Sequence, residues 1–432
     1  MALMSLTSYD AAQATAPSLV TLYNFTYGGS YGPDTGLLFG PSGAIYGAAG
    51  GGISGQGVIF ELAPPAAPGG AWTENVIYQF NGDAVDGDGR EPNGGLVFGA
   101  NRALYGTTTY GGDGDNGTVF ELSPPAVPGG AWTETVIYRF TGASDGGWPY
   151  SGLAAGPHGV LYGTLYAGPA FQLIPPVSPG GTWTYALLYN IGGDAYNLLS
   201  GPDGVLYGSM ASAGMGWVFD LVPPLIKGDA WTYDSVYFFS GSEAGLPSGP
   251  LLLGPDGTLF GSETLASEES GVVFQLTPQG QGMPWTESVL HSLPAGSRDG
   301  VDPCYLVMGQ DGLLYGATRV GGGVHNAACG KLGCGMLFQL KAPAVAGDAW
   351  TEVVLHRFTG GSDGAGPQNL ILGPDGALYG TTIGGGSSGG GTLFRFSEGN
   401  NELRISGAWE SVAKPLDRVW SIKPSTAIVG VD

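Results

Sequence analysis

One short phrase recurs seven times along the chain, and this repetition constrains the fold more than any other feature of the sequence. It reads RALYGTTTYGG from Arg102 and GALYGTTIGGG from Gly376, and the other five copies are more divergent. Each copy carries one aromatic marker, and the seven markers are Tyr46, Tyr105, Tyr162, Tyr207, Phe260, Tyr315 and Tyr379. Successive markers lie 45 to 64 positions apart. A period of that size fits the blades of a propeller.

Each copy of the repeat predicts four short strands. An apolar run leads into a tight turn such as GPDG, which begins at Gly201, Gly254 and Gly373. Proline presets φ in such a turn, and glycine supplies the positive φ that a hairpin needs. The LYGT strand follows, then a strand such as GTVFEL, a Pro-rich link and a strand such as WTETVIYRF. Four strands in each of seven copies, without helical periodicity, predict an all-β fold: a seven-bladed β-propeller of four-stranded antiparallel blades.

The two ends of the array predict how the ring closes. Residues 19–25 (LVTLYNF) match the end of a fourth strand with no first three strands before it, and the last repeat lacks a clear fourth strand. We therefore expect strand 19–25 to complete blade 7, so that the propeller spans residues 19–396. Alternatively, GAWESVAK, which begins at Gly407, supplies that strand. Residues 1–18 are expected to form an N-terminal extension, and residues 397–432 a C-terminal tail of unknown role.

The chain is strongly acidic. It has 14 Lys and Arg residues against 36 Asp and Glu residues, a formal net charge of −22. Such a surface repels nucleic acids and anionic membranes, and no apolar run is long enough for a transmembrane helix. We therefore expect neither a nucleic-acid partner nor membrane insertion. The first 18 residues contain no Lys or Arg and no apolar segment, so no signal peptide is recognisable.

The repeat resembles the Gloeo/Verruco (GloVer) repeat of exported bacterial proteins. The nearest copies are the second, RALYGTTTYGGDGDNGTVFEL, and the seventh, GALYGTTIGGGSSGGGTLFRF, and the resemblance spans residues 19–396. It implies a β-propeller-like protein that is extracellular or displayed on the cell surface. It implies no activity, because the family has no accepted catalytic residues to carry over. Blades 3 and 5 depart most from the pattern, with YAGPAF and ETLASEES in place of the glycine pair.

The loops that follow the second and fourth strands open on one face of such a propeller, here called the loop face. These loops are long and variable, whereas the opposite face carries the repeated turns and links, so we expect function on the loop face. The recurring Tyr and Trp residues are expected to pack blade against blade. Aromatic and polar residues of the blade 2 and blade 3 loops break the repeat and predict a ligand-binding cluster. Its members are Tyr110, Asp113, Asp115, Asn116, Asp145, Trp148, Tyr150 and Tyr166. Aromatic faces beside acidic hydrogen-bonding groups suit sugar rings.

An acidic residue recurs before the innermost strand of six repeats. These residues are Asp86, Asp145, Asp194, Glu243, Asp299 and Asp363. Each carboxylate could cap its own loop by accepting backbone N–H hydrogen bonds. Alternatively, the carboxylates form a ring at the mouth of the tunnel that could hold Ca²⁺.

A second candidate cluster lies in blade 6 and comprises Arg298, Asp299, Asp302, Arg319 and His325. Cys329 and Cys334 follow in the stretch HNAACGKLGC. They are predicted to form a disulfide that closes an extended loop in an oxidising compartment. The alternatives are a metal site with His325, although the spacing matches no known zinc pattern, and free thiols.

These features favour a non-catalytic, exported or surface-displayed propeller that binds carbohydrate or protein through its loop face. One alternative is an extracellular glycoside hydrolase or polysaccharide lyase that uses loop-face carboxylates as acid and base. Another is a structural module of a surface assembly. The hydrolase needs two carboxylates that face each other across the mouth, whereas the binding protein needs only the aromatic residues.

Overall fold

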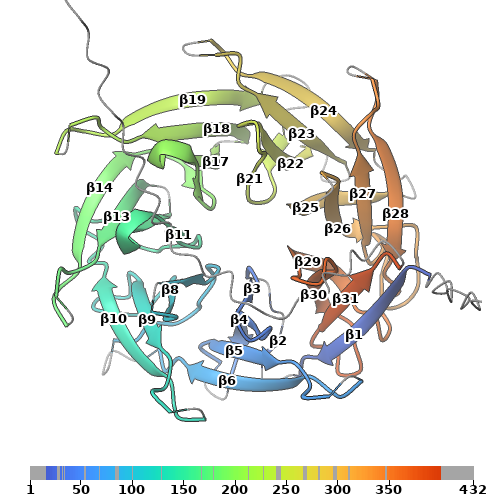
Figure 1. Cartoon of the computed structure of the whole chain (residues 1–432), viewed down its shortest axis with the longest axis horizontal. Helices are drawn as coiled ribbons and strands as arrows, with labels where there is room; N and C mark the ends of the chain where they lie inside the picture. The colour runs from blue at the N-terminus through green and yellow to red at the C-terminus, as the bar shows by residue number, and fades with distance from the viewer. Residues whose placement is uncertain are drawn as a thin grey trace, which may run out of the picture.

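Seven antiparallel sheets stand around one axis in the computed structural model of the chain (Figure 1). The structure describes residues 16–399, apart from short gaps at 27–29, 32, 34, 53–54, 68, 83–86, 100, 128, 167, 179, 213, 227, 240–244, 266–269, 281–282, 295–298, 310–311 and 346–347. The fold is the predicted all-β, seven-bladed propeller of mostly four-stranded sheets. Within the described residues, no helix is long and apolar enough to cross a membrane.

The first four blades follow one another along the chain, each running from the axis outward. Blade 1 holds β2 (Ser30–Tyr31), β3 (Leu38–Phe39), β4 (Ile45–Gly51), β5 (Val58–Ala63) and β6 (Thr73–Gln79). Blade 2 holds β7 (Val97–Phe98), β8 (Leu104–Thr108), β9 (Thr118–Ser123) and β10 (Thr133–Arg139). Blade 3 holds β11 (Ala154–Ala155), β12 (Leu161–Thr164), β13 (Pro169–Ile174) and β14 (Thr184–Asn190). Blade 4 holds β15 (Asp194–Ala195), β16 (Leu199–Ser200), β17 (Leu206–Ser212), β18 (Met215–Val222) and β19 (Thr232–Phe239).

The last three blades repeat the same arrangement. Blade 5 holds β20 (Gly245–Pro247), β21 (Leu252–Leu253), β22 (Leu259–Leu265), β23 (Gly271–Thr277) and β24 (Thr286–Leu293). Blade 6 holds β25 (Gly300–Met308), β26 (Leu314–Gly321), β27 (Met336–Lys341) and β28 (Thr351–Arg357). Blade 7 holds β29 (Ala365–Leu372), β30 (Leu378–Gly384), β31 (Thr392–Ser397) and β1 (Ser18–Asn24). Blades 1, 4 and 5 count five strands because their innermost strand is split in two.

The N-terminal strand closes the ring. β1 pairs antiparallel with β31, with Ser18 opposite Ser397 and Asn24 opposite Thr392, and it forms the outer edge of blade 7 (Figure 1). Phe25 follows directly, donates its backbone N–H to the carbonyl of Gly391 at 3.0 Å and is fully buried. The alternative strand at Gly407 lies outside the described residues, as do residues 1–15 and 400–432.

Aromatic side chains fill the space between neighbouring blades. The marker Tyr46 of blade 1 meets Trp132 of blade 2 edge to face at 6.0 Å between ring centroids, and Tyr105 meets Trp183 of blade 3 in the same way. The Phe of each third strand is fully buried between blades, as Phe60 of blade 1 illustrates by packing against Phe25, which follows β1 of blade 7. The repeated Tyr and Trp residues therefore pack blade against blade as the sequence predicts.

A glycine of one blade receives a proline of the next at five blade junctions. A Cβ atom built on Gly117 of blade 2 would lie 2.6 Å from Cδ of Pro149 in blade 3, and one on Gly57 of blade 1 would lie 2.3 Å from Cδ of Pro92. The same contact joins Gly216 to Pro247, Gly271 to Pro303 and Gly335 to Pro367. Only glycine leaves room for this approach, so packing explains the glycine at the start of the third strand in these five blades. We call these contacts the Gly–Pro junctions.

Candidate functional site

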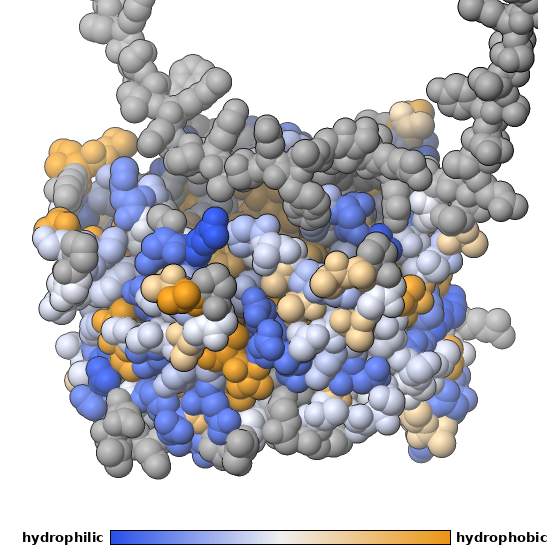
Figure 2. All heavy atoms as spheres, turned by 60° about the horizontal axis from the view of Figure 1, so that its bottom comes forward, coloured by the Kyte–Doolittle hydropathy of each residue, from blue (hydrophilic) through white to orange (hydrophobic). Residues whose placement is uncertain are grey.

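A cavity of about 430 Å³ lies on the propeller axis, and residues from all seven blades line it. Gly95 stands just before the innermost strand β7, whereas Gly36 and Gly249 lie between the two halves of the split innermost strands of blades 1 and 5. Arg319 and Ile383 stand near the ends of the second strands β26 and β30. The second strands end at loops of the loop face, so the cavity opens toward that face. Figure 2 shows the outer surface of the ring, on which hydrophobic residues form small separate patches among polar ones.

The cavity wall combines aromatic rings with neutral hydrogen-bonding groups. Tyr150, Tyr196 and Tyr305 supply the rings. Burial, with Asp194 and Tyr150 nearby, raises the pKa of Tyr196, so its hydroxyl remains a proton donor at neutral pH. The other neutral polar side chains of the wall are those of Thr35, Asn93, Ser151, Asn197, Ser248 and Gln368. No carboxylate stands among the lining residues that the structure describes.

Hydrogen bonds between blades hold this wall in place. The side-chain oxygen of Asn197 in blade 4 accepts the backbone N–H of Gly152 in blade 3 at 2.7 Å. Ser248 of blade 5 donates its hydroxyl to the carbonyl of Pro303 in blade 6 at 2.5 Å. Asn369 of blade 7 donates its amide to the carbonyl of Pro33 in blade 1 at 3.0 Å. Because these bonds span three different junctions, the cavity is fixed by the ring as a whole.

Arg319 is the cation of the described cavity wall. Its guanidinium Nη1 lies 3.1 Å from Oδ2 of Asp302, and the other carboxylate oxygen of Asp302 accepts the hydroxyl of Thr264 at 2.7 Å. Asp302 has a φ of 57°, a left-handed conformation just before Pro303. Two members of the predicted blade 6 cluster thus meet at the cavity as an ion pair.

The predicted blade 2 and blade 3 residues come together beside the cavity. The guanidinium of Arg90 lies over the ring of Tyr110, 4.6 Å from its centroid, and bonds both carboxylate oxygens of Asp115 at 2.9 and 3.1 Å. Trp148 donates its indole N–H to the carbonyl of Asp115 at 3.2 Å. Tyr166 donates its backbone N–H to the carbonyl of Trp148 at 3.0 Å. Loops of two blades therefore form one continuous surface.

Three aromatic side chains of this surface face solvent. Trp148 is 42%, Tyr150 61% and Tyr166 57% exposed, and Tyr150 also lines the cavity. Trp148 has a φ of 56°, and its backbone N–H is bound to the carbonyl of Asn116 at 2.7 Å. We call Trp148, Tyr150 and Tyr166 the aromatic shelf. The aromatic shelf adjoins the cavity through Tyr150, and within it Trp148 has a backbone conformation that residues other than glycine rarely adopt.

Asp113 and Asp145 lie apart from the aromatic shelf. Asp113 is exposed, with a carboxylate oxygen 3.9 Å from Nε of Arg139. Asp145 is buried, where it accepts the hydroxyl of Tyr138 and both the backbone N–H and the hydroxyl of Thr141. Although burial opposes it, these hydrogen bonds, those from Thr141 foremost, lower the pKa of Asp145. Asp145 therefore caps its own loop, and its place in the ligand-binding cluster stays a prediction.

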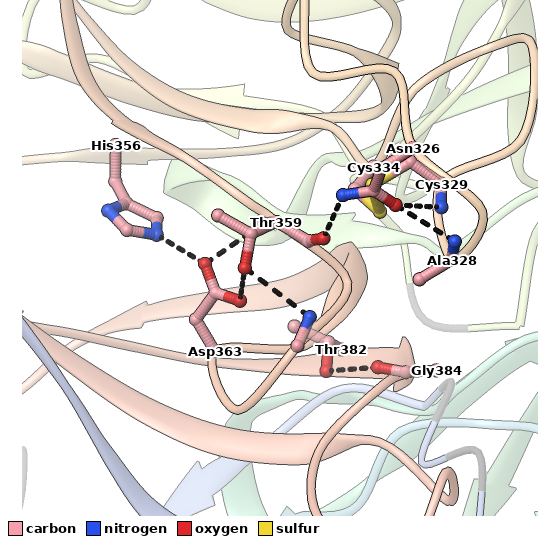
Figure 3. The surroundings of a disulfide bond; sticks show 10 residues. Asn326, Ala328, Cys329, Cys334, His356, Thr359, Asp363, Thr382 and Gly384 are labelled. Carbon is pink, nitrogen blue, oxygen red and sulfur yellow. Dashed lines mark hydrogen bonds and ion pairs between the residues drawn. A yellow bond between two sulfur atoms is a disulfide. The ribbon is translucent and has the colours of Figure 1, made fainter.

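A second of the recurring acids also caps its own loop. Asp363 accepts the backbone N–H and the hydroxyl of Thr359 and contacts His356 Nε2 at 3.0 Å (Figure 3). In blade 1 the corresponding cap is Asp88, which accepts the hydroxyl of Tyr78 and the backbone N–H of Asn81. Asp86 and Glu243 lie outside the described residues. Among the residues that the structure describes, no three His, Cys, Asp or Glu side chains lie close enough together to bind one metal ion. The Ca²⁺ site stays a prediction.

Arg298, Asp299 and His325 are the other residues of the predicted blade 6 cluster, and the backbone carbonyl of Asp299 accepts the N–H of Gly322 at 3.4 Å. Arg298 lies outside the described residues, and His325 is exposed on the loop between β26 and β27. Cys329 and Cys334 form a disulfide there, with their Cα atoms 4.7 Å apart. Asn326 braces this loop because its side chain donates to the carbonyl of Thr359 and accepts the backbone N–H of Cys329 (Figure 3). Since both sulfurs are bonded to each other, they offer no thiolate to a metal.

Sequence reasoning missed Arg90 and most of the cavity wall. Arg90 sits in a loop with no distinctive motif, so only its contact with Tyr110 and Asp115 identifies it. Most wall residues share one signal, although Arg319 and Ile383 do not. They lie within three residues before a Leu that recurs in each copy, as Tyr150 precedes Leu153 and Tyr305 precedes Leu306. The residues of that interval differ from one copy of the repeat to the next, whereas the residues that flank it recur.

Comparison with known proteins gives a family and a fold. The sequence model of the Gloeobacter/Verrucomicrobia repeat matches residues 7–182 and 194–417. No curated protein matches the chain. The structure of virginiamycin B lyase from Staphylococcus aureus is 14% identical with a TM-score of 0.53, and the alignment covers 88% of this chain and 99% of that one. A protein from Lactobacillus plantarum is 16% identical with a TM-score of 0.50, and the alignment covers 79% and 96%. Such identities show the propeller fold alone.

Proposed function

The chain belongs to the Gloeobacter/Verrucomicrobia repeat family, and from this premise we propose that it is a non-catalytic, exported or surface-displayed propeller that binds a neutral carbohydrate at its loop face. The aromatic shelf is the observation that carries the proposal. Trp148, Tyr150 and Tyr166 are exposed at the mouth of an axial cavity rather than packed into the blades. Aromatic rings presented in this way stack against the C–H faces of sugar rings.

The chemistry of the cavity supports a neutral, hydroxyl-rich ligand. Amide, hydroxyl and phenol groups such as Asn93, Asn197, Ser248 and Tyr196 can donate to and accept from sugar hydroxyls. The net charge of −22 disfavours anionic ligands. A protein partner would need a broader apolar contact, which fits the polar wall less well than a sugar does.

Export is supported by two independent features. Repeats of this kind are typical of exported bacterial proteins, as the resemblance of the sequence implies. The Cys329–Cys334 disulfide persists best in an oxidising compartment outside the cytoplasm. We therefore place the bound carbohydrate outside the cell, in a cell wall, a capsule or the surroundings.

The test is an array of neutral and anionic glycans probed with the full chain. We expect binding to a subset of neutral glycans, and loss of that binding in Tyr150→Ala, because Tyr150 joins the aromatic shelf to the cavity. The matched control is Tyr189→Ala, which removes a tyrosine of 39% exposure from the outer strand β14, away from the mouth. Absence of neutral-glycan binding by the wild-type chain would overturn the proposal, as would equal losses in the two variants.

A further inference from the structure

We infer that the axial cavity receives the end of a glycan chain, and that Arg319, which Asp302 holds in place, recognises the hydroxyls of its terminal sugar residue. This inference rests on the proposed function and makes it more specific. It concerns which part of a glycan is bound and which residues determine the choice.

The closed ring requires entry by a chain end. Every blade contributes to the cavity wall, and the ring is closed by the pairing of β1 with β31. The Gly–Pro junctions and the axial hydrogen bonds of Asn197, Ser248 and Asn369 seal the blades against one another. A wall without a side opening admits a polymer only along the axis, so an internal segment of a stiff glycan cannot enter sideways.

The volume limits how much of the chain can enter. A cavity of about 430 Å³ is near the small end of the range of roughly 300–1,000 Å³ for small-molecule sites. It therefore fits one or two sugar residues, and the rest of the chain must leave through the mouth. The aromatic shelf stands at that mouth, where Trp148 and Tyr166 can stack against the residues outside.

Arg319 offers several hydrogen-bond donors to neighbouring sugar hydroxyls, because its guanidinium is a planar fork of N–H groups. Asp302 holds Arg319 through Nη1 at 3.1 Å and is itself held by Thr264. The side chain of Arg319 is still 41% exposed into the cavity, and its buried Nε has no hydrogen-bond partner. A sugar diol would complete a pair that is already oriented.

The pair faces the aromatic part of the wall across the axis. Tyr150 and Tyr196 belong to blades 3 and 4, and Arg319 belongs to blade 6, on the far side of the ring (Figure 1). A sugar ring between them can place one face on an aromatic ring and its hydroxyl edge on the ion pair. Specificity for particular hydroxyl stereochemistry would follow from the fixed position of that pair.

The experiment uses calorimetry with a panel of neutral oligosaccharides of two to six sugar residues. Each oligosaccharide is tested in three forms: uncapped, reduced at its reducing end, and O-methylated at its non-reducing end. For any series that binds, we expect capping of one particular end to weaken binding by at least about tenfold, the cost of a lost charge-assisted hydrogen bond. Arg319→Met should weaken binding of the uncapped sugar to a similar degree and remove the difference between capped and uncapped forms. Arg319→Lys keeps the charge but loses the planar fork, so it should bind more weakly than the wild type.

Arg395→Met is the matched control, because it breaks an Arg–Asp pair of similar length, 2.8 Å to Asp375, at the opposite face. It should leave binding unchanged, and melting temperatures will show that the Arg319 variants are folded. The inference is overturned if both capped forms bind as tightly as the uncapped sugar. It is also overturned if the folded Arg319→Lys and Arg319→Met variants bind as tightly as the wild type. In either case the proposed glycan binding still stands. If no neutral oligosaccharide binds the wild type, the proposed function and this inference both fall.

Discussion

Trp148 of blade 3 donates its indole N–H to the backbone carbonyl of Asp115 in blade 2, 3.2 Å away. The bond crosses a blade junction, and its acceptor is a backbone atom whose position the β8–β9 loop determines. Asp115 in turn is held by Arg90 and by the backbone N–H of Gly111. The indole is therefore oriented before any ligand arrives, which lowers the entropic cost of binding.

We predict that Trp148→Ala abolishes glycan binding and barely changes the melting temperature. Trp148 is 42% exposed and stands in a loop outside the blade cores, so its loss opens no cavity in a core, and Ala bears the same cost of a φ of 56° as Trp does. A lost stacked aromatic typically costs about 2 kcal/mol or more in binding free energy. Glycan-array binding and thermal unfolding measure the two effects separately.

Phe238→Ala is the control for this prediction, because Phe238 is 39% exposed on the outer strand β19 and far from the mouth. Binding should survive that substitution. A large drop in melting temperature for Trp148→Ala would instead identify the indole as a structural support of the blade 2–3 junction.

We predict that Gly117→Ala destabilises the ring more than Gly129→Ala. Both glycines have positive φ, 89° and 80°, so both substitutions carry the left-handed cost of roughly 1–2 kcal/mol. Only at Gly117 would the new Cβ collide, 2.6 Å from Cδ of Pro149 and 2.5 Å from the carbonyl of Thr108, whereas nothing lies within 4 Å at Gly129. The extra cost should be about 1–3 kcal/mol, measured by denaturant unfolding, and equal losses would show that the Gly–Pro junction adds nothing.

The fold could be predicted from the sequence because the repeat encodes it many times over. The markers Tyr46 and Tyr105, with Trp132 and Trp183, recur at positions where each blade must pack on the next. An error in the assignment of one copy therefore does not change the predicted number of blades. Asp86 was assigned as the recurring acid of the first blade, although Asp88 makes the cap, and the blade number was still correct.

The site was harder to predict because function lies where the copies differ. The exposed aromatics Trp148 and Tyr166 could be identified since they break the pattern. The capping role of Asp145 could not be assigned, because a carboxylate that caps a loop and one that faces a ligand look alike in sequence. The contact of Arg319 with the axial cavity depends on how seven distant segments converge, and no local pattern encodes that.

We predict that removal of residues 1–25 costs more stability than removal of residues 1–15. The longer deletion takes away β1, exposes the edge of β31 and removes the fully buried Phe25, which packs 5.5 Å from the ring of Phe60. Loss of one buried Phe side chain alone costs roughly 3–5 kcal/mol. The shorter deletion leaves β1 intact and serves as the control. Equal unfolding midpoints in denaturant for the two truncations would contradict closure by β1.

Glu263 of β22 gives the propeller a carboxyl group that is poorly suited to ionisation. It is 4% exposed, and its Oε2 has no hydrogen-bond partner. The pKa of Glu263 rises from an ordinary value of 4.5 to about 8, mainly because the side chain is buried. The negative charge of Glu287 raises this pKa further, whereas a backbone hydrogen bond from Gly245 lowers it. The corresponding positions of blades 2 and 7 carry Thr108 and Thr382, which are neutral and hydrogen-bonded to Thr118 and Thr392.

We predict that Glu263→Gln stabilises the protein at high pH and has little effect at pH 4. Between pH 4.5 and about 8 the folded state keeps the proton of Glu263, whereas the unfolded state releases it. The free energy of unfolding therefore falls as pH rises through that window, by at most about 1.4 kcal/mol per pH unit, and the loss is complete above it. Glutamine cannot ionise, so the stability of Glu263→Gln should fall less steeply across the window, and at pH 9 the variant should unfold at higher denaturant than the wild type. Asp203→Asn is the control, because it changes an exposed carboxyl group in a turn of the opposite face. Its curve of stability against pH should run parallel to that of the wild type. A parallel curve for Glu263→Gln as well would show that Glu263 ionises freely in the folded protein.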